Sequence, residues 1–245
     1  MAGDTKYAIL GDIHGNLDAL DAVLDHAKSL GIQRFACVGD LVGYNACPGP
    51  CITRIREIGA VTVQGNHDYF AATDEPLKDF SPLAASVIEW TRHVLTTEQK
   101  EFLKNLRLKR MCDGFMMVHS TLDNPGKWGY VFDEVHAADH FAYQTAAICF
   151  HGHTHIPAVF RKMGERTERL PPEPITFSFG SKLFVNVGSV GQPRDNDPRA
   201  CYVIYDSASR SITFHRVSYN VAAAQKRILE AGLPERLALR LALGK

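Results

Sequence analysis

Short apolar segments alternate with amphipathic segments in the first part of this chain, and this alternation restricts the folds that it can adopt. The apolar segments have the length of strands, whereas the segments between them carry apolar residues at helical spacing. The expected strands cover residues 6–10, 35–38 and 61–63, and the expected helices cover 17–30 and 52–58. Strands that are apolar throughout are buried on both faces of their sheet. The pattern therefore predicts an α/β fold in which helices cover a central sheet.

The alternation is interrupted after residue 80. Ser81 and Pro82 are a typical helix start, and Thr96 precedes a second helical segment. Two helices are expected there, over residues 81–90 and 96–106. We interpret them as a helical insertion, covering about residues 80–110, over one edge of the sheet.

Strands return in the second half of the chain. The expected strands cover 115–118, 147–150, 175–179, 183–187, 201–205 and 212–215, and the expected helices cover 135–143, 221–231 and 233–243. The charged tract 161–169 and the prolines within 171–174 predict an exposed connection. No repeat or linker divides the chain, so a single domain of residues 1–245 is expected, ending in helices over about 220–244.

The charge balance excludes some classes of partner. Lys and Arg together number 27, as do Asp and Glu, so no net field draws the chain to duplex nucleic acid or to a membrane. We find neither a membrane-spanning stretch nor the apolar core of a signal peptide. The six cysteines are scattered and lack the spacing of a redox pair or a zinc ribbon, which favours reduced thiols and a cytoplasmic location.

Polar side chains that bind metals follow five of the expected strands directly. The candidate ligands are Asp12, His14, Asp40, Asn66, His119, His153 and His155. Because open α/β sheets bind their ligands at the carboxyl ends of the strands, we expect these side chains to meet in one crevice. Taken singly, each of them has a structural alternative, such as a turn residue or a core histidine. Together they predict a site for borderline or hard divalent ions.

Seven candidate ligands are too many for one ion. A carboxylate that bridges two ions lets both reach four protein ligands and leaves positions for water. Two ions about 3.5–4 Å apart are a common device for hydrolysing phosphate esters, because they hold both the attacking and the leaving oxygen. The sequence therefore predicts two divalent ions, drawn from Mn²⁺, Fe, Zn²⁺, Ni²⁺ and Co²⁺.

The ordered series Asp-x-His, Gly-Asp, Gly-Asn-His-Asp, His and Gly-His-x-His resembles the calcineurin-like metallophosphoesterase superfamily. The series spans residues 12–155, and residues 185–194 and 219–221 resemble its small prokaryotic phosphodiesterases, a subgroup described as diadenosine-tetraphosphatase-like. This resemblance implies a two-sheet α/β sandwich with a dinuclear site and a metal-bridging hydroxide that attacks phosphorus in line. It also implies that Asp12, His14 and His155 hold one ion, that Asn66, His119 and His153 hold the other, and that Asp40 bridges them.

The resemblance gives the remaining motif residues other roles. His67 is implied to face the substrate, either as general acid for the leaving oxygen or to stabilise charge on the phosphoryl group. Asp68 is a candidate to orient His67. His151 extends the fifth cluster, but strand alternation points it away from the metals, so a structural role is expected.

The chain departs from the phosphoprotein phosphatases of this superfamily in two motifs. Residues 39–45 and 64–68 lack the two arginines that grip a phosphate and the aspartate that partners the catalytic histidine in those enzymes. A bidentate guanidinium grip matters most for a dianionic monoester. Arg194 is a candidate replacement on a later loop. These departures favour phosphodiester or phosphoanhydride bonds of a nucleotide-like small molecule, while His67 keeps a phosphomonoesterase as the alternative.

Further alternatives remain at this point. Tyr69, Trp128 and Tyr130 lie on loops after motif residues, where they either stack on a nucleobase or cover the core. A non-catalytic scaffold on the same fold predicts eroded ligands, whereas all seven candidates are intact here. A nuclease would need an extended basic groove, for which the composition offers no support.

Overall fold

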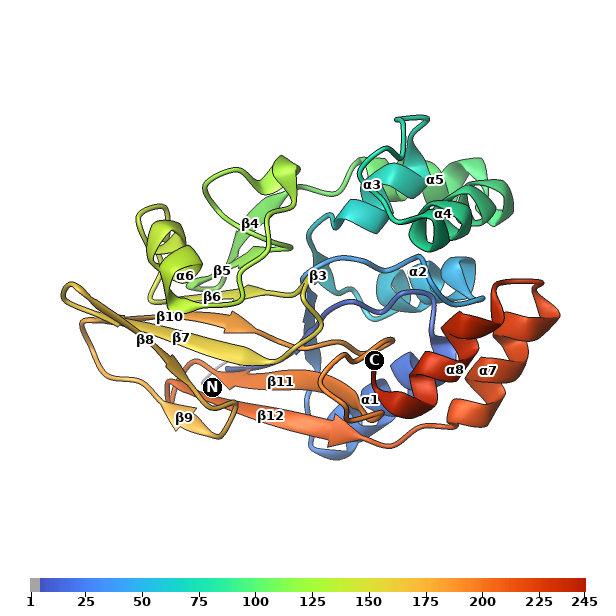
Figure 1. Cartoon of the computed structure of the whole chain (residues 1–245). Helices are drawn as coiled ribbons and strands as arrows, with labels where there is room; N and C mark the ends of the chain where they lie inside the picture. Colours follow the sequence, from blue (N-terminus) through green and yellow to red (C-terminus); the bar gives the residue numbers. More distant parts are fainter. Residues whose placement is uncertain (1–4) are drawn as a thin grey trace.

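The computed structural model describes residues 5–245. Residues 1–4 lie outside the described residues. They are part of the N-terminal segment for which the sequence predicts no signal peptide. One sheet consists of β1 (Lys6–Leu10), β2 (Arg34–Cys37), β3 (Val61–Thr62), β9 (Ile175–Thr176), β11 (Ala200–Asp206) and β12 (Ser211–Val217). The other consists of β4 (Lys109–Cys112), β5 (Phe115–Val118), β6 (Ile148–His151), β7 (Ala158–Met163), β8 (Arg166–Leu170) and β10 (Ser181–Asn186). Figure 1 shows the two sheets layered on each other, with helices around them.

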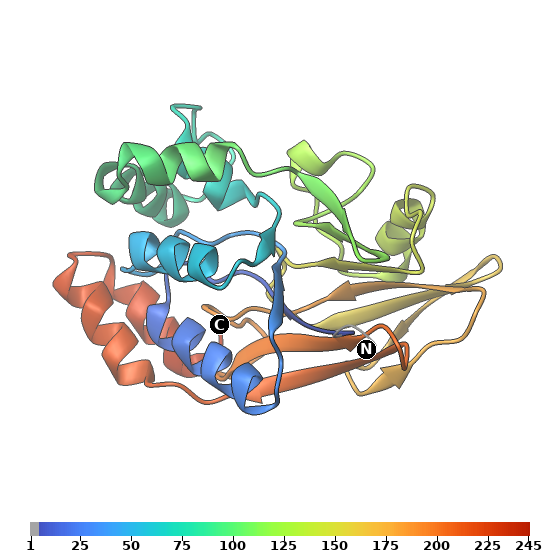
Figure 2. The ribbon, with the colours of Figure 1, turned by 180° about the vertical axis from the view of Figure 1, so that it is seen from behind.

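Helices occupy the outer faces and one end of this sandwich. They are α1 (Leu17–Ser29), α2 (Pro48–Glu57), α3 (Asn66–Ala72), α4 (Pro82–Val94), α5 (Thr97–Lys104), α6 (Glu134–Phe141), α7 (Val221–Glu230) and α8 (Glu235–Leu243), with a 3-10 turn at Pro125–Lys127. Figures 1 and 2 both place α3 to α5 at the same end of the molecule as α7 and α8. None of the helices within residues 5–245 is long and apolar enough to cross a membrane.

The core follows from the alternation of side chains along each strand. In β1, Tyr7 and Ile9 point between the sheets, into a cluster with residues of β2, β5, β6 and β10. Ala8 and Leu10 point to the other face and pack under α1 and α2. A third cluster joins α6 to the outer face of the second sheet. The two-sheet α/β sandwich predicted from the sequence is therefore confirmed.

Strand direction brings the polar clusters to one region. In the first sheet β1, β2 and β3 run parallel in the order β3-β2-β1, and in the second β5, β6 and β10 run parallel. Parallel neighbours end at the same edge of their sheet, so the loops that follow them gather there. This arrangement joins motifs that lie far apart in the sequence.

Several helix boundaries agree with the capping residues expected from the sequence. The side chain of Asn16 accepts a hydrogen bond from the N–H of Ala19 at the start of α1, and Ser81 accepts one from Ala84 at the start of α4. The helices expected after residue 96 and in the C-terminal segment are α5, α7 and α8. All six cysteines are free thiols.

Three segments differ from the sequence-based expectation. The tract 161–169 is not a connection, because β7 and β8 pair as an antiparallel hairpin at the edge of the second sheet. Charged residues suit an edge strand, whose side chains face solvent, and Arg161 pairs across the hairpin with Glu168. The short strand β4 is likewise exposed and basic. Helix α3, which begins at the motif residue Asn66, was also missing from the expectation.

Candidate metal centre

The candidate ligands come from the loops that follow β1, β2, β5 and β6 and from the start of α3. All seven are buried, and none exposes more than 8% of its surface. Asp12, His14, Asp40, His153 and His155 also have a positive φ, between 49° and 71°. Residues other than glycine rarely adopt this main-chain conformation, which costs roughly 1–3 kcal/mol per residue. The fold therefore holds these side chains in place against a local backbone preference.

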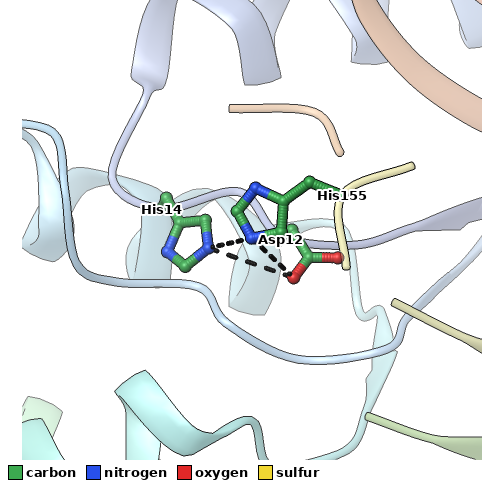
Figure 3. Close-up of side chains that lie close together, drawn as sticks. All are labelled: Asp12, His14 and His155. Carbon is green, nitrogen blue, oxygen red and sulfur yellow. Dashed lines mark hydrogen bonds and ion pairs between the residues drawn. The ribbon is translucent and has the colours of Figure 1, made fainter. Parts of the chain in front are cut away.

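Three of the ligands converge on one point (Figure 3). The Nε2 atoms of His14 and His155 lie 3.0 Å apart, and the carboxylate of Asp12 lies 3.4 Å from His155 Nε2 and 3.9 Å from His14 Nε2. Two ring nitrogens at this distance both direct their lone pairs or protons at the same space. A cation between them fits this geometry.

A second group lies beside the first. His119 Nε2 lies 3.1 Å from both Asn66 Oδ1 and His153 Nδ1. The carboxylate of Asp40 connects the two groups, because its Oδ2 lies 3.3 Å from His119 Nε2 and 3.6 Å from His14 Nε2. The structure thus brings all seven candidate ligands together.

The outer nitrogens of three histidines are held by main-chain carbonyl groups. Nδ1 lies 2.9 Å from the oxygen of Val42 in His14, 2.9 Å from that of Val38 in His119, and 2.6 Å from that of Gln192 in His155. A carbonyl only accepts, so Nδ1–H donates and Nε2 of each ring faces the centre. This is the usual support of a histidine metal ligand.

Burial dominates the electrostatics of the centre. It lowers the pKa of His14 and of His155 well below the usual range, and raises the pKa of Asp12 to about 7. Burial alone would raise the pKa of Asp40, but the surrounding histidines, His119 foremost, together outweigh burial and lower that pKa. In return, the Asp40 carboxylate overcomes burial and raises the pKa of His119 to about 9. These buried donors fit divalent metal ions, which would replace the His119 proton as counter-charge to the carboxylates.

His67 lies beside the two groups just described, and one of its ring nitrogens forms a third set with ligand atoms of His14 and Asp40, all within 4.8 Å of one another. Its ring centre lies 4.8 Å from that of His14 and 4.6 Å from that of Tyr44, and its Nδ1 is buried without a hydrogen-bond partner in residues 5–245. Its main-chain N–H donates to Asp40 Oδ1 at 2.9 Å. Burial lowers the pKa of the ring to about 4.

Asp68 contacts the main chain and not the ring of His67. Its carboxylate accepts hydrogen bonds from the N–H groups of Asp40, Leu41 and Gly65 at 2.8, 2.8 and 3.0 Å. Asp68 therefore holds the loop after β2 against the start of α3. His151, as the strand alternation predicts, points away from the centre and stacks on Phe184.

The segment after β10 supports the centre through hydrogen bonds. Ser189 Oγ donates to the main-chain oxygen of Asp12 at 2.7 Å, and Asn186 Nδ2 donates to that of Gly152 at 2.7 Å. Residues 185–194, which the sequence analysis treated as one motif, thus include residues that hold the ligand loops. Sequence reasoning had no signal for these individual contacts.

A cavity of about 540 Å³ opens beside the candidate ligands. It is lined by Tyr44, Asn66, His67, Phe70, Asp79, Phe80, Ser81, Ala84, Lys127, Trp128, Tyr130, His153, Arg194 and Arg240. Trp128 and Tyr130 therefore face the cavity, and the Tyr130 ring stacks on His153 with ring centres 4.1 Å apart. Tyr69 lies behind them, beside Trp128. Sequence reasoning missed Tyr44 and Arg240.

The sandwich of two mixed sheets, with candidate histidine and carboxylate ligands at its strand ends, is an arrangement shared with metallophosphoesterases. The model of the calcineurin-like phosphoesterase superfamily domain matches residues 6–210, and the chain belongs to this superfamily of phosphoesterases.

Individual relatives extend this similarity over the whole chain. An uncharacterized protein, MJ0912 of Methanocaldococcus jannaschii, is 38% identical over 98% of this chain and 99% of its own. A metallophosphoesterase from Sphaerobacter thermophilus superposes with a TM-score of 0.87 at 34% identity, covering 99% of this chain and 100% of that one. The hypothetical protein PH1004 from Pyrococcus horikoshii OT3 has the same fold, with a TM-score of 0.80 at 18% identity over 98% of each chain.

Proposed function

We propose that this protein hydrolyses phosphodiester or phosphoanhydride bonds in a nucleotide-like small molecule, with two divalent metal ions at the candidate centre. The position of Asp40 carries the proposal. Its carboxylate lies within 3.6 Å of a histidine from each group of ligands, as expected for a ligand that two ions share. When bound, two such ions acidify a water molecule and neutralise charge on the phosphoryl group.

The seven candidate ligands form two sets of three, and Asp40 is shared between them. Asp12, His14 and His155 would hold the first ion, and Asn66, His119 and His153 would hold the second. Oxygen and imidazole ligands without thiolate suit Mn²⁺, Fe, Zn²⁺, Ni²⁺ or Co²⁺. Asp68 is a positioning residue, because it holds the main chain of Asp40.

His67 contacts the substrate in this proposal. The low pKa of its ring, about 4, means that the imidazole is neutral at pH 7. A neutral ring donates one hydrogen bond, which favours stabilising charge on a phosphoryl or leaving oxygen over transferring a full proton to it. Arg194, which also lines the cavity, adds positive charge for the phosphate.

The cavity supports a small nucleotide-like substrate. Its volume of about 540 Å³ is in the range of small-molecule sites. Aromatic rings from several loops line it, Trp128 and Tyr130 among them, and such rings stack on the faces of nucleobases. The arginines that would grip a phosphoprotein monoester are absent from residues 39–45 and 64–68.

Paired hydrolysis rates test this proposal. The purified protein with added Mn²⁺ is given bis(p-nitrophenyl) phosphate, a diester, and p-nitrophenyl phosphate, the matching monoester. A higher kcat/KM for the diester supports the proposal. A higher kcat/KM for the monoester favours the alternative, a phosphomonoesterase, and turnover of neither by metal-loaded protein contradicts both.

A further inference from the structure

Two arginines from distant parts of the chain meet at the wall of the cavity. Arg194 lies on the loop after β10, and Arg240 lies in the last turns of α8, beyond the segment that the superfamily model matches. Their guanidinium carbons lie 5.5 Å and 6.0 Å from the centre of the Tyr44 ring. The same ring lies 4.6 Å from that of His67. Both positive charges therefore face the cavity close to the candidate centre.

Neither guanidinium pairs with an aspartate or glutamate side chain within residues 5–245. Arg194 donates to Gln192 Oε1 at 3.0 Å, but its Nε is buried without an acceptor. Arg240 Nε donates to an oxygen of the terminal carboxyl group on Lys245, whereas its terminal nitrogens form no hydrogen bond within the described residues. Most buried or half-buried charges are paired, since desolvation without a partner is costly. Two guanidiniums with N–H groups that lack acceptors, at one cavity wall, indicate a site for an anion.

The other charges of the cavity wall agree with this reading. Lys127 adds a third positive side chain, and the exposed Asp79 is the one carboxylate among the described lining residues. Burial, together with the nearby charge of Arg194, lowers the pKa of Arg240. An anion bound between the two guanidiniums would remove this repulsion.

The cavity continues past Arg240. A second cavity, of about 690 Å³, shares Ser81 and Arg240 with the first, so the two adjoin at these residues. It lies between the start of α4 and the exposed face of α8, and its lining includes Leu83, Leu239 and Leu243. An elongated ligand that starts at His67 and extends into the second cavity passes Arg240.

We propose that Arg194 and Arg240 bind a second phosphate group of the substrate, linked to the phosphate that is hydrolysed. This inference rests on the proposed function and narrows it to molecules with at least two linked phosphates, such as nucleoside polyphosphates. Guanidinium groups suit this task, because their paired N–H donors match the oxygens of a phosphate. The second cavity then holds the part of the substrate beyond that phosphate.

Binding of inorganic tripolyphosphate to the metal-free full-length protein, measured by calorimetry, tests this inference. We expect Arg240→Gln to weaken binding about tenfold or more, because it removes charge-assisted hydrogen bonds. Arg240→Lys keeps the charge without the paired donors and is expected to weaken binding less. The matched control is Lys226→Gln on α7, which removes one charge of an exposed pair with Glu230 and is expected to change binding less than about twofold. Unchanged thermal unfolding verifies that the variants fold.

Two results overturn the inference: wild-type protein that does not bind tripolyphosphate, or an Arg240→Gln variant that binds it as tightly as wild type. Hydrolysis of bis(p-nitrophenyl) phosphate by wild-type protein tests the proposed function separately. This diester carries one phosphate, so its hydrolysis does not depend on a second phosphate subsite. Among active variants, the ratio of kcat/KM for ATP to that for this diester is expected to fall about tenfold in Arg240→Gln, mainly through KM.

Discussion

The carboxylate of Asp68 accepts a hydrogen bond from the main-chain N–H of Asp40, with 2.8 Å between donor and acceptor. The side chain of Asp40 in turn accepts a hydrogen bond from the main-chain N–H of His67 at 2.9 Å. The central carboxylate of the candidate centre and the residue proposed to contact substrate are thus held by one short network. Asp68 thus acts on the central carboxylate through the main chain that carries it.

Substituting Asp68 by Asn should weaken both the fold and metal binding. The amide replaces one carboxylate oxygen by a donor that faces main-chain N–H groups, which is expected to cost about 1–3 kcal/mol of the free energy of unfolding. Because Asp40 shifts with its loop, we expect metal affinity to fall about 10- to 100-fold. Denaturant unfolding and metal titration measure the two effects. Metal affinity equal to that of wild type would contradict the positioning role.

Gly65 leaves no room for a side chain beside Asp40. A Cβ at this position would lie 2.1 Å from Asp40 Oδ1 and 2.4 Å from its main-chain nitrogen. We therefore expect Gly65→Ala to displace the carboxylate and to reduce metal binding at least about tenfold. Gly126→Ala is the control, because the nearest atom to its Cβ would be 3.6 Å away, on Leu108. If both variants bind metal equally well, the short distance between Gly65 and Asp40 does not matter for metal binding.

His67→Ala should separate catalysis from metal binding. We expect the variant to keep the metal content of wild type while kcat falls about 10²- to 10⁴-fold, because the proposed hydrogen bond to the phosphoryl or leaving oxygen is lost. His119→Ala serves as comparison, since it removes a proposed ligand and should lose metal. Elemental analysis gives the metal content of each variant, and kinetics on the same samples give kcat. Loss of metal from His67→Ala to the same extent as from His119→Ala would make His67 a ligand.

His140 is expected to make stability depend on pH. Its ring stacks on Phe184, Nδ1 accepts a hydrogen bond from the N–H of Leu122, and burial lowers its pKa to about 3. Below its ordinary pKa of 6.5 the unfolded chain takes up a proton that the folded chain does not. The free energy of unfolding should therefore fall as pH falls from about 6.5 to about 3, by at most about 1.4 kcal/mol per pH unit from this group.

Urea unfolding of the metal-free protein at several pH values between about 6 and 4 measures this slope. His140→Gln should flatten it relative to wild type, whereas His93→Gln, at an exposed position on α4 whose ring contacts a main-chain oxygen, should change it less. The other charges around His140 are Asp123, which favours the protonated ring, and Lys182, which opposes it. Equal slopes in wild type and His140→Gln would show that the ring does not stay neutral in the folded chain.

The sandwich and the set of candidate ligands were predictable because they depend on local pattern. An apolar strand such as 6–10 followed directly by Asp12 and His14 indicates both a buried strand and its carboxyl end. By contrast, the hairpin over 158–170 was missed because the end of β7 and the edge strand β8 carry charged residues and resemble a loop in composition.

Contacts made by tertiary packing could not be inferred in the same way. Arg240 follows no strand, and it reaches the cavity because α8 packs against Tyr44 and α4. Asp68 immediately follows His67, which made it a candidate to orient that ring, yet its carboxylate points to the main chain of another loop. Adjacency in sequence does not determine the direction of a side chain at the start of a helix.

Metal stoichiometry tests the central claim most directly. Protein loaded with Mn²⁺ and freed of excess ion is analysed for metal per chain by mass spectrometry, with Asp40→Asn as the matched variant. The proposed shared position of Asp40 predicts two ions per chain in wild type and fewer in the variant. One ion per chain in wild type at saturation, or an Asp40→Asn variant that retains two, would contradict the dinuclear centre.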